Sequence, residues 1–249
     1  MIIGDHGGGI AGVAWDDTSY GDNLSLTEVS QAISASNVTH FDVIGFDACL
    51  QGVFDQAYSL QLQSDYQVVS ENLEPGDGWS YTNWLTIFNQ ESTPTALQVA
   101  TAAVNSYSAF YQARGDNGIT LSAISSNQVG GLAEAWSSFA QSVNAEGTSA
   151  VASLDLARAS TLTYYSNYVD LSGLMTNFIQ DNSNSSLDLS AQAVLTALSL
   201  AVIVTGGNSN AHGLTVYMPA SADSNYLNGI SYPATTLVGV SDLYHSMWV

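Results

Sequence analysis

A lone thiol and a histidine each follow a short apolar run in this sequence. Cys49, the only cysteine, ends the run at residues 41–49, and His6 follows residues 1–4 and Asp5. A thiol becomes a useful nucleophile when a neighbouring imidazole or the positive end of a helix favours the thiolate. The two residues therefore predict nucleophilic catalysis, with Cys49 as the attacking group and His6 as its partner.

The segment between the two residues indicates how the fold brings them together. Residues 24–33 space their apolar side chains at three and four, the period of a helix, with Ser25 or Thr27 as its cap. A strand, a helix and a second strand form a crossover, so both strands should be parallel neighbours in one sheet. Their carboxyl ends then lie at the edge where open α/β sheets place their ligand-binding and catalytic residues.

The rest of the chain continues this alternation. The helical period recurs at residues 53–62, 95–112 and 128–143. Strand-like runs occur at residues 66–70, 119–124 and 213–219. The apolar stretch 191–204 is too short to span a bilayer and indicates a core helix running into a strand. The pattern predicts an α/β fold with a mostly parallel sheet, and the absence of a long linker predicts a single domain over residues 1–249.

The charge balance excludes several classes of function. The 22 acidic residues face only Arg114 and Arg158, with no lysine, and the net charge is −20. Such a field repels nucleic acid and anionic membranes, so we expect neither as a partner. It suits a saline environment, where salt screens self-repulsion, or a secreted protein that must stay dispersed. We expect a monomer.

The competing histidines fit the catalytic role less well. His40 precedes the run that ends at Cys49, so it should lie at the opposite edge of the sheet. His245 lies in the C-terminal tail, as a surface or packing residue. His212 is also followed by glycine, as His6 is, but it precedes its strand instead of following it.

Each residue also has an ordinary structural interpretation. A free cysteine is most often a buried structural thiol, and a histidine before glycines is often a turn residue. The joint placement of Cys49 and His6 favours catalysis. A metal-dependent hydrolase using His6, Asp5 and other acids remains an alternative.

Three sequence motifs together resemble those of the clostripain family of cysteine peptidases. This family shares a caspase-like fold with gingipains, legumains and caspases. The three motifs are His6-Gly7, Asp47-Ala48-Cys49-Leu50, and Ser70-Glu71 followed by Glu74-Pro75-Gly76-Asp77-Gly78-Trp79 and Tyr81. Weaker likeness continues through residues 120–124 and 213–219, so the resemblance covers nearly the whole chain.

The resemblance implies a three-layer α/β/α sandwich and a cysteine endopeptidase that cleaves after Arg or Lys. His6 and Cys49 would be the catalytic dyad, with the amides of Gly7 and Cys49 forming the oxyanion hole. Asp47 and Asp77 occupy the positions of the acids that line the family's S1 pocket. No cofactor is required by this resemblance, although calcium activates some relatives.

Charge alone favours the same specificity. A pocket for a basic side chain needs carboxylates, whereas a pocket for aspartate needs arginine, and only Arg114 and Arg158 exist to supply it. The expected partners are therefore proteins or peptides with basic residues. No lysine or arginine lies between His6 and Cys49, which excludes self-cleavage after a basic residue there.

Some features depart from the family pattern. The chain begins five residues before His6, so we expect the sheet to lack upstream N-terminal strands, and Asp55 stands near a glutamate of the relatives. An inactive caspase-fold binding module is thus a further alternative.

The acids Asp16, Asp17 and Asp22 could offer oxygen ligands to calcium, but they lack an EF-hand spacing. A solvated loop is the preferred interpretation. We expect a secreted or cell-surface protein of bacterial or archaeal type.

Overall fold

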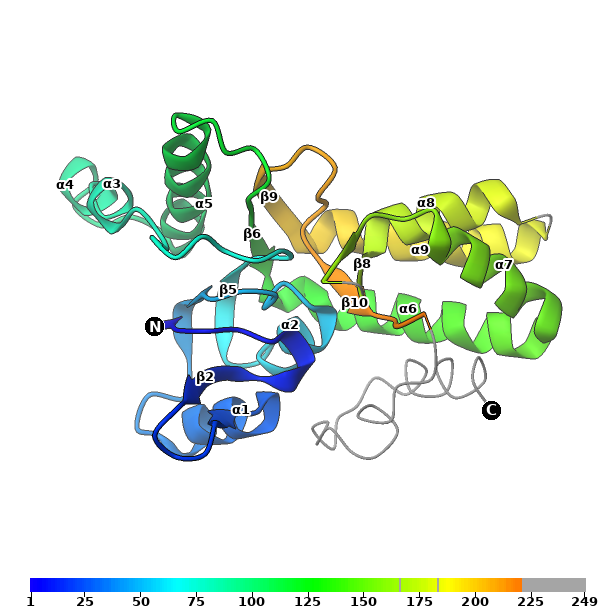
Figure 1. The fold of residues 1–249 in the computed structure, drawn as a ribbon, viewed down its shortest axis with the longest axis horizontal. Helices are drawn as coiled ribbons and strands as arrows, with labels where there is room; N and C mark the ends of the chain where they lie inside the picture. The colour runs from blue at the N-terminus through cyan, green and yellow to red at the C-terminus, as the bar shows by residue number, and fades with distance from the viewer. Residues whose placement is uncertain (166, 183, 221–249) are drawn as a thin grey trace.

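A mixed five-stranded sheet forms the centre of the computed structural model, which describes residues 1–165, 167–182 and 184–220 (Figure 1). The strands, in their order across the sheet, are β1 (Ile2–Gly4), β4 (Phe41–Asp47), β5 (Ser64–Val69), β6 (Thr120–Ser125) and β9 (Val202–Gly207). Strands β1, β4 and β5 are parallel, and β6 is antiparallel to both β5 and β9. Most of the sheet therefore runs in one direction, as predicted, and β6 alone runs against it.

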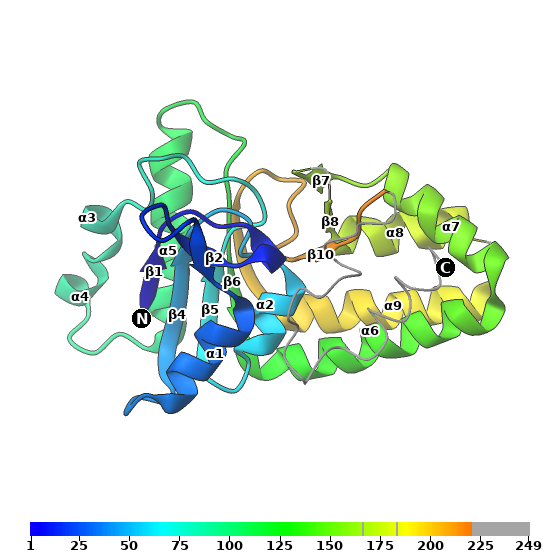
Figure 2. The same cartoon turned by 60° about the horizontal axis from the view of Figure 1, so that its bottom comes forward.

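Side chains of β4 alternate between two cores, as the pleat of a strand requires. Val43 packs into one apolar cluster, while Ile44 and Phe46 pack into the other. The first cluster includes residues of α3 (Tyr81–Trp84) and α5 (Ala96–Gln112), and the second includes residues of α1 (Leu26–Ala35) and α2 (Phe54–Ser59). The short helix α4 (Ile87–Gln90) contacts α5 but contains no buried residue. Figure 2 shows these two helical layers on either side of the sheet. The predicted three-layer sandwich is confirmed.

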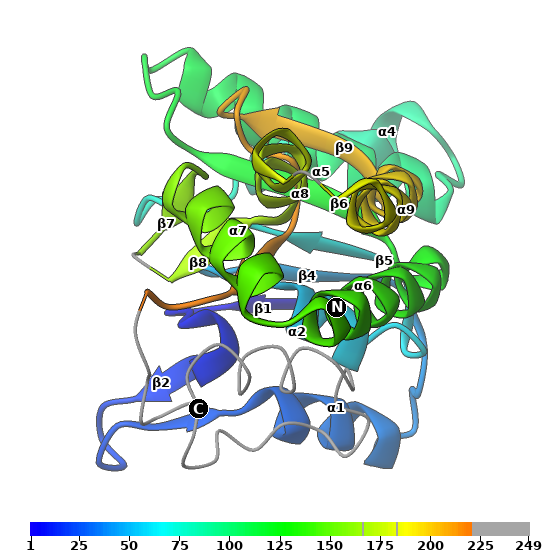
Figure 3. The ribbon, with the colours of Figure 1, turned by 90° about the vertical axis from the view of Figure 1, so that its right-hand side faces the viewer.

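Four further helices form an arm that projects beyond the sheet (Figures 1 and 3). They are α6 (Ser126–Glu146), α7 (Thr148–Ala159), α8 (Leu171–Asp181) and α9 (Ser185–Ala201). Gly147, at φ 76°, separates α6 from α7 in a left-handed conformation that glycine adopts without strain. The arm shares one continuous core with the α1 and α2 side of the sheet. The sequence indicated part of α6 and the α9–β9 junction but not the arm.

The crossover from β1 to β4 brings the two predicted catalytic loops to one edge. Ile2 pairs with Gly45 and Gly4 with Asp47, so the strands are parallel neighbours. Within the crossover, a hairpin of β2 (Val13–Asp16) and β3 (Asp22–Leu24) precedes α1. Ser25 caps α1 and exchanges hydrogen bonds with Glu28, which forms a capping box.

The strand before His6, β1, is only partly buried, because it lies at the sheet edge with β4 as its one neighbour among the described residues. The strand-like run 213–219 does contain a buried strand, β10 (Thr215–Tyr217), which lies outside the central sheet. It joins β8 (Tyr168–Asp170) and β7 (Thr163–Tyr164) in a small antiparallel sheet.

In the part of the chain that the structure describes, no helix combines the length and the apolar character needed to cross a bilayer. His245 lies outside the described residues.

Candidate active site

Cys49 lies in a sharp turn just after β4. The next residue, Leu50, has φ 62°, a left-handed conformation that is costly for a residue with a side chain. Its N–H donates to the carbonyl of Asn72 at 3.1 Å, and the N–H of Gly52 donates to the carbonyl of Ser70 at 2.6 Å. The segment after β5 thus holds the strained turn and fixes the thiol at the sheet edge.

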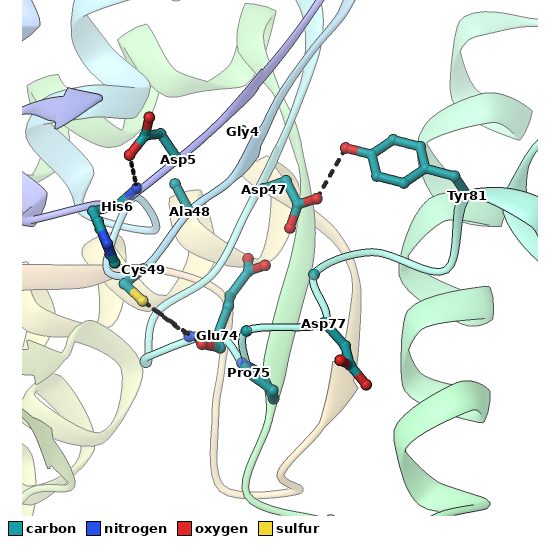
Figure 4. A pocket seen from close by; sticks show the side chains of 12 residues that line it. Gly4, Asp5, His6, Asp47, Ala48, Cys49, Glu74, Pro75, Asp77 and Tyr81 are labelled. Atoms are coloured by element: carbon teal, nitrogen blue, oxygen red, sulfur yellow. Dashed lines mark hydrogen bonds between the residues drawn. The ribbon is translucent and has the colours of Figure 1, made fainter. Parts of the chain in front are cut away.

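Gly7 places the His6 loop directly against the Cys49 backbone. A Cβ atom built on Gly7 would lie 2.0 Å from the carbonyl oxygen of Cys49 and 2.8 Å from its nitrogen. Only glycine fits such a close approach of two backbones. The structure therefore brings His6 and Cys49 together, and Figure 4 shows their side chains next to each other.

The small sheet supports the loop that follows His6. The hydroxyl of Tyr168, in β8, donates to the carbonyl of Gly8 at 2.6 Å and accepts from the N–H of Ile10 at 3.2 Å. The carbonyl of His6 accepts from the N–H of Ala14 at 2.9 Å. The backbone is thus held at several points, while the His6 side chain stays exposed.

The thiol makes its hydrogen bonds with the backbone of Glu74. The N–H of Glu74 donates to Sγ at 3.2 Å, and the thiol points to the carbonyl of the same residue at 3.8 Å. The backbone of Glu74, in the loop after β5, therefore holds the thiol in place. The first helix after Cys49, α2, begins only at Phe54, after an intervening turn.

Two backbone donors near the thiol remain available. Within the described residues, the N–H groups of Gly7 and Cys49 donate to no acceptor, and the His6 imidazole makes no hydrogen bond with the thiol. The two side chains instead line the same cavity of about 670 Å³. Unused donors beside a nucleophile are what the stabilisation of an oxyanion requires.

The other wall of this cavity is acidic. Asp47 Oδ2 accepts a hydrogen bond from the N–H of Trp79 at 3.2 Å. It also accepts one from the hydroxyl of Tyr81 at 2.9 Å (Figure 4). Glu74 Oε2 accepts from Trp79 Nε1 at 3.1 Å. Burial, and next the charge of Asp47, raises the pKa of Glu74 well above its ordinary value.

Asp77 lines the same cavity from its exposed rim. Its Oδ2 accepts a hydrogen bond from Arg114 Nη1 at 2.6 Å, and its side chain is 66% exposed. The guanidinium of Arg114 also lies 3.8 Å from the ring centroid of Phe110. Of the two acids that we expected in the S1 pocket, Asp47 therefore lies inside and Asp77 at the mouth.

The other candidate residues lie away from the thiol. His40 precedes β4 and pairs with Asp65 at 3.0 Å, at the predicted opposite end of the strand. His212 pairs through Nδ1 with the buried Asp170 at 2.8 Å and lines neither cavity that Cys49 lines.

The acids considered for calcium are exposed and lie along the β2–β3 hairpin. Asp16 accepts hydrogen bonds from the N–H and the hydroxyl of Thr18, and Asp22 accepts from the N–H of Asn23. Among the described residues, no group of three or more potential metal ligands is found. A calcium requirement stays a prediction.

Sequence reasoning missed two features of the site. Glu74 was noted only as part of a motif that resembles the clostripain family. Its position just before Pro-Gly and close to Trp79 was a local signal of a partly buried carboxylate. A second cavity of about 530 Å³ lies on the other side of His6 and Cys49. Its aromatic lining comprises Trp15, Tyr165, Tyr168 and Tyr217. Nothing in the sequence indicated that these distant residues would meet.

Comparison with known structures shows the same fold. A B. fragilis cysteine protease has a TM-score of 0.68 at 19% identity, over 94% of this chain and 98% of that chain. A secreted C11 cysteine protease from Bacteroides thetaiotaomicron, in complex with an irreversible peptide inhibitor, also has a TM-score of 0.68 at 19% identity, over 97% and 71% of the two chains. A clostripain from the same organism, in complex with the peptide inhibitor BTN-VLTK-AOMK, has a TM-score of 0.65 at 13% identity, over 95% and 99%.

Among curated proteins, no sequence matches the chain significantly. The model of the clostripain family, however, matches residues 1–232, which is most of the chain. The chain therefore belongs to the clostripain family of cysteine peptidases.

Proposed function

We propose that the protein is a cysteine endopeptidase that cleaves after Arg or Lys, with Cys49 as nucleophile and His6 as its acid–base partner. The observation that supports this proposal is a single cavity lined by the thiol, the imidazole and the carboxylates of Asp47, Glu74 and Asp77. Nucleophile and cation-binding groups must share one cavity if the bond after a basic residue is to reach the sulfur.

The reaction is acyl transfer in two stages. The Cys49 thiolate attacks the carbonyl carbon, and the N–H groups of Gly7 and Cys49 donate to the oxygen as it gains negative charge. His6 gives a proton to the leaving amine when the peptide bond breaks. Water, deprotonated by His6, then attacks the acyl group and releases the second product with the thiol restored.

The charges around the cavity support a basic P1 side chain. Neither arginine of the chain is placed to bind an acidic one, because Arg114 pairs with Asp77 and Arg158 Nε donates to the carbonyl of Met218. The clostripain from Bacteroides thetaiotaomicron supports the same specificity, since the peptide VLTK of its inhibitor ends in lysine.

A matched pair of substrates tests the proposal. Two fluorogenic peptides would differ only at P1, which is arginine in one and citrulline, its uncharged isostere, in the other. We expect cleavage of the arginine peptide at least ~100-fold faster in kcat/KM, since a desolvated ion pair is worth several kcal/mol. Cys49→Ala should abolish cleavage of both peptides. Mass spectrometry of a cleaved protein would show whether internal bonds are cut.

Other outcomes would select the alternatives. No cleavage of either peptide or of the protein substrate, by a protein shown to be folded, would favour a binding module of the same fold. Activity that survives Cys49→Ala and disappears with a chelator would favour a metal-dependent hydrolase using His6 and Asp5. Loss with a chelator in the wild type alone, reversed by calcium, would show calcium activation of the peptidase.

Export is part of the proposal. Two of the similar structures are secreted C11 cysteine proteases from Bacteroides thetaiotaomicron, and a strongly acidic chain suits a dispersed extracellular enzyme.

A further inference from the structure

The buried carboxyl of Glu74 is only half satisfied. Its Oε2 accepts a hydrogen bond from the indole of Trp79, whereas Oε1 is buried and receives none from any described residue. Figure 4 shows the side chain pointing along the cavity toward Asp47. A buried carboxylate oxygen without a donor is costly, so this atom indicates a missing partner.

A proton or a cation would satisfy this oxygen and offset the charge around it. Of two carboxyl groups that face each other in one cavity, each disfavours the ionisation of the other unless a counter-charge lies nearby. Burial and the charge of Asp47 raise the pKa of Glu74, which favours a proton there when the cavity is empty. The other titratable groups that interact electrostatically with Glu74 are Cys49, Tyr81, Tyr107 and Tyr111.

None of these neighbours supplies a positive charge. Burial, above all, raises the pKa of each of the three tyrosines, and the charge of nearby carboxylates, Glu74 among them, adds to the rise, so their hydroxyls stay neutral. The guanidinium of Arg114 interacts electrostatically with Tyr111, but it is paired with Asp77 at the rim. The cavity thus has an acidic interior with no internal cation among the described residues.

We propose that Glu74 and Asp47 together bind the positive charge of the P1 side chain, and that Glu74 loses its proton to solvent when this charge enters. This inference rests on the proposed function, because it assigns the acids that recognise a basic P1 residue. The step balances: neutral Glu74 and a cationic ligand become an ion pair and one free proton. Asp77, already paired, contributes less.

The sign of the pH effect follows from this exchange. Below the pH at which Glu74 ionises in the empty cavity, a cation must displace the proton. Binding of the cation therefore weakens about tenfold for each unit by which the pH falls. Above that pH, binding of the cation no longer depends on this proton. A neutral P1 side chain does not displace the proton, so its binding lacks this dependence.

The ratio of kcat/KM for the arginine and citrulline peptides isolates this effect. The pH dependence of the catalytic steps that the two substrates share cancels in the ratio. We expect the wild-type ratio to rise with pH and then level off. In Glu74→Gln, which keeps an acceptor for Trp79, the ratio should fall ~10- to 100-fold and lose its dependence on pH.

Two further variants are compared with Glu74→Gln. Glu91→Gln makes the same chemical change at the exposed end of α4 and should leave the wild-type curve intact. Asp77→Asn should lower the ratio less than Glu74→Gln does and should keep the slope with pH. A larger fall in Asp77→Asn than in Glu74→Gln would overturn the assignment.

A binding measurement covers the case in which Glu74→Gln does not fold. Titration calorimetry of Cys49→Ala with N-acetyl-arginine amide, in buffers of different ionisation enthalpy, counts the protons released. We expect up to about one proton per ligand at mildly acidic pH, falling toward zero at alkaline pH. Binding without proton release across this range would overturn the inference.

The failures of the two proposals are distinguishable. If the wild type does not prefer arginine to citrulline, and the amide does not bind, the basic specificity itself is wrong. If arginine is preferred but the preference and its slope survive in Glu74→Gln, the specificity stands and the role of Glu74 is wrong.

Discussion

The contact between Gly7 and Cys49 shows that bare backbone, as much as any side chain, positions the thiol and the imidazole. The Cβ position of residue 7 overlaps the carbonyl group of Cys49. Any side chain there must push the two loops apart, which separates His6 from the thiol.

Gly7→Ala should therefore lower kcat/KM by ~100-fold or more, because a displacement of about 1 Å between reacting groups has effects of that size. The measurement is cleavage of the arginine peptide, with circular dichroism to show that the fold is kept. Gly131→Ala, at an open position in α6, is the matched control and should keep full activity. Equal activity in both variants would show that the loops do not need this contact.

At the scale of residues, the sequence indicated that His6, Cys49 and Asp47 lie close together, but it did not single out Glu74. His6 and Cys49 follow strands and Asp47 ends one, so the register of parallel neighbours determines where the three meet. Glu74 lies in a loop, and its burial depends on Trp79, which packs against Trp84 in α3 at 5.5 Å between ring centroids. Local sequence rules do not describe such packing between separate segments.

At the scale of elements, the short helix α2, which follows the Cys49 turn in the chain, contains an unusual acid. Asp55 lies in the first turn of α2 and is 8% exposed, and burial raises its pKa to about 6. The folded protein therefore holds this proton more tightly than the unfolded chain. The free energy of unfolding should fall as the pH rises from about 4 to about 6, where the buried group becomes charged.

Asp55→Asn should remove this loss. At pH near 4 the variant and the wild type should be about equally stable, whereas at neutral pH the variant should be more stable by up to ~3 kcal/mol. Urea unfolding at several pH values measures the difference. Asp17→Asn, at an exposed position, should show no such trend. A constant difference across pH would mean that Asp55 does not titrate in this range.

Elements with strong periodicity were predictable, and elements defined by distant pairing were not. The apolar spacing of residues 24–33 and 95–112 indicated α1 and α5, and Ser25 was one of the two caps considered for α1. By contrast, β7 and β8 contain two and three residues, and β8 pairs with β10, which lies far away in the sequence. Such short strands leave little periodic signal, so the sheet that supports the His6 loop was missed.

At the scale of the whole molecule, the dominant property is its negative charge. The chain has a net charge of −20, and both of its arginines, Arg114 and Arg158, already contact partners within the fold. Self-repulsion destabilises a compact state of this charge, and salt screens it.

Salt should therefore stabilise the protein. We expect Tm to rise by ~5 °C or more between 0.02 and 1 M NaCl, measured by differential scanning fluorimetry. The double variant Glu134→Lys and Glu146→Lys, at exposed positions of α6, should show a smaller rise. An unchanged Tm in the wild type would mean that the charges lie too far apart to matter.

The lone thiol also makes this chain easy to study. Because Cys49 is the only cysteine and lines both cavities, an alkylating fluorophore attaches once per molecule and always at the same place. The stoichiometry of labelling would count functional molecules in a preparation directly. The emission of the attached dye would then report each change in the solvation of the two cavities, without background from other sites.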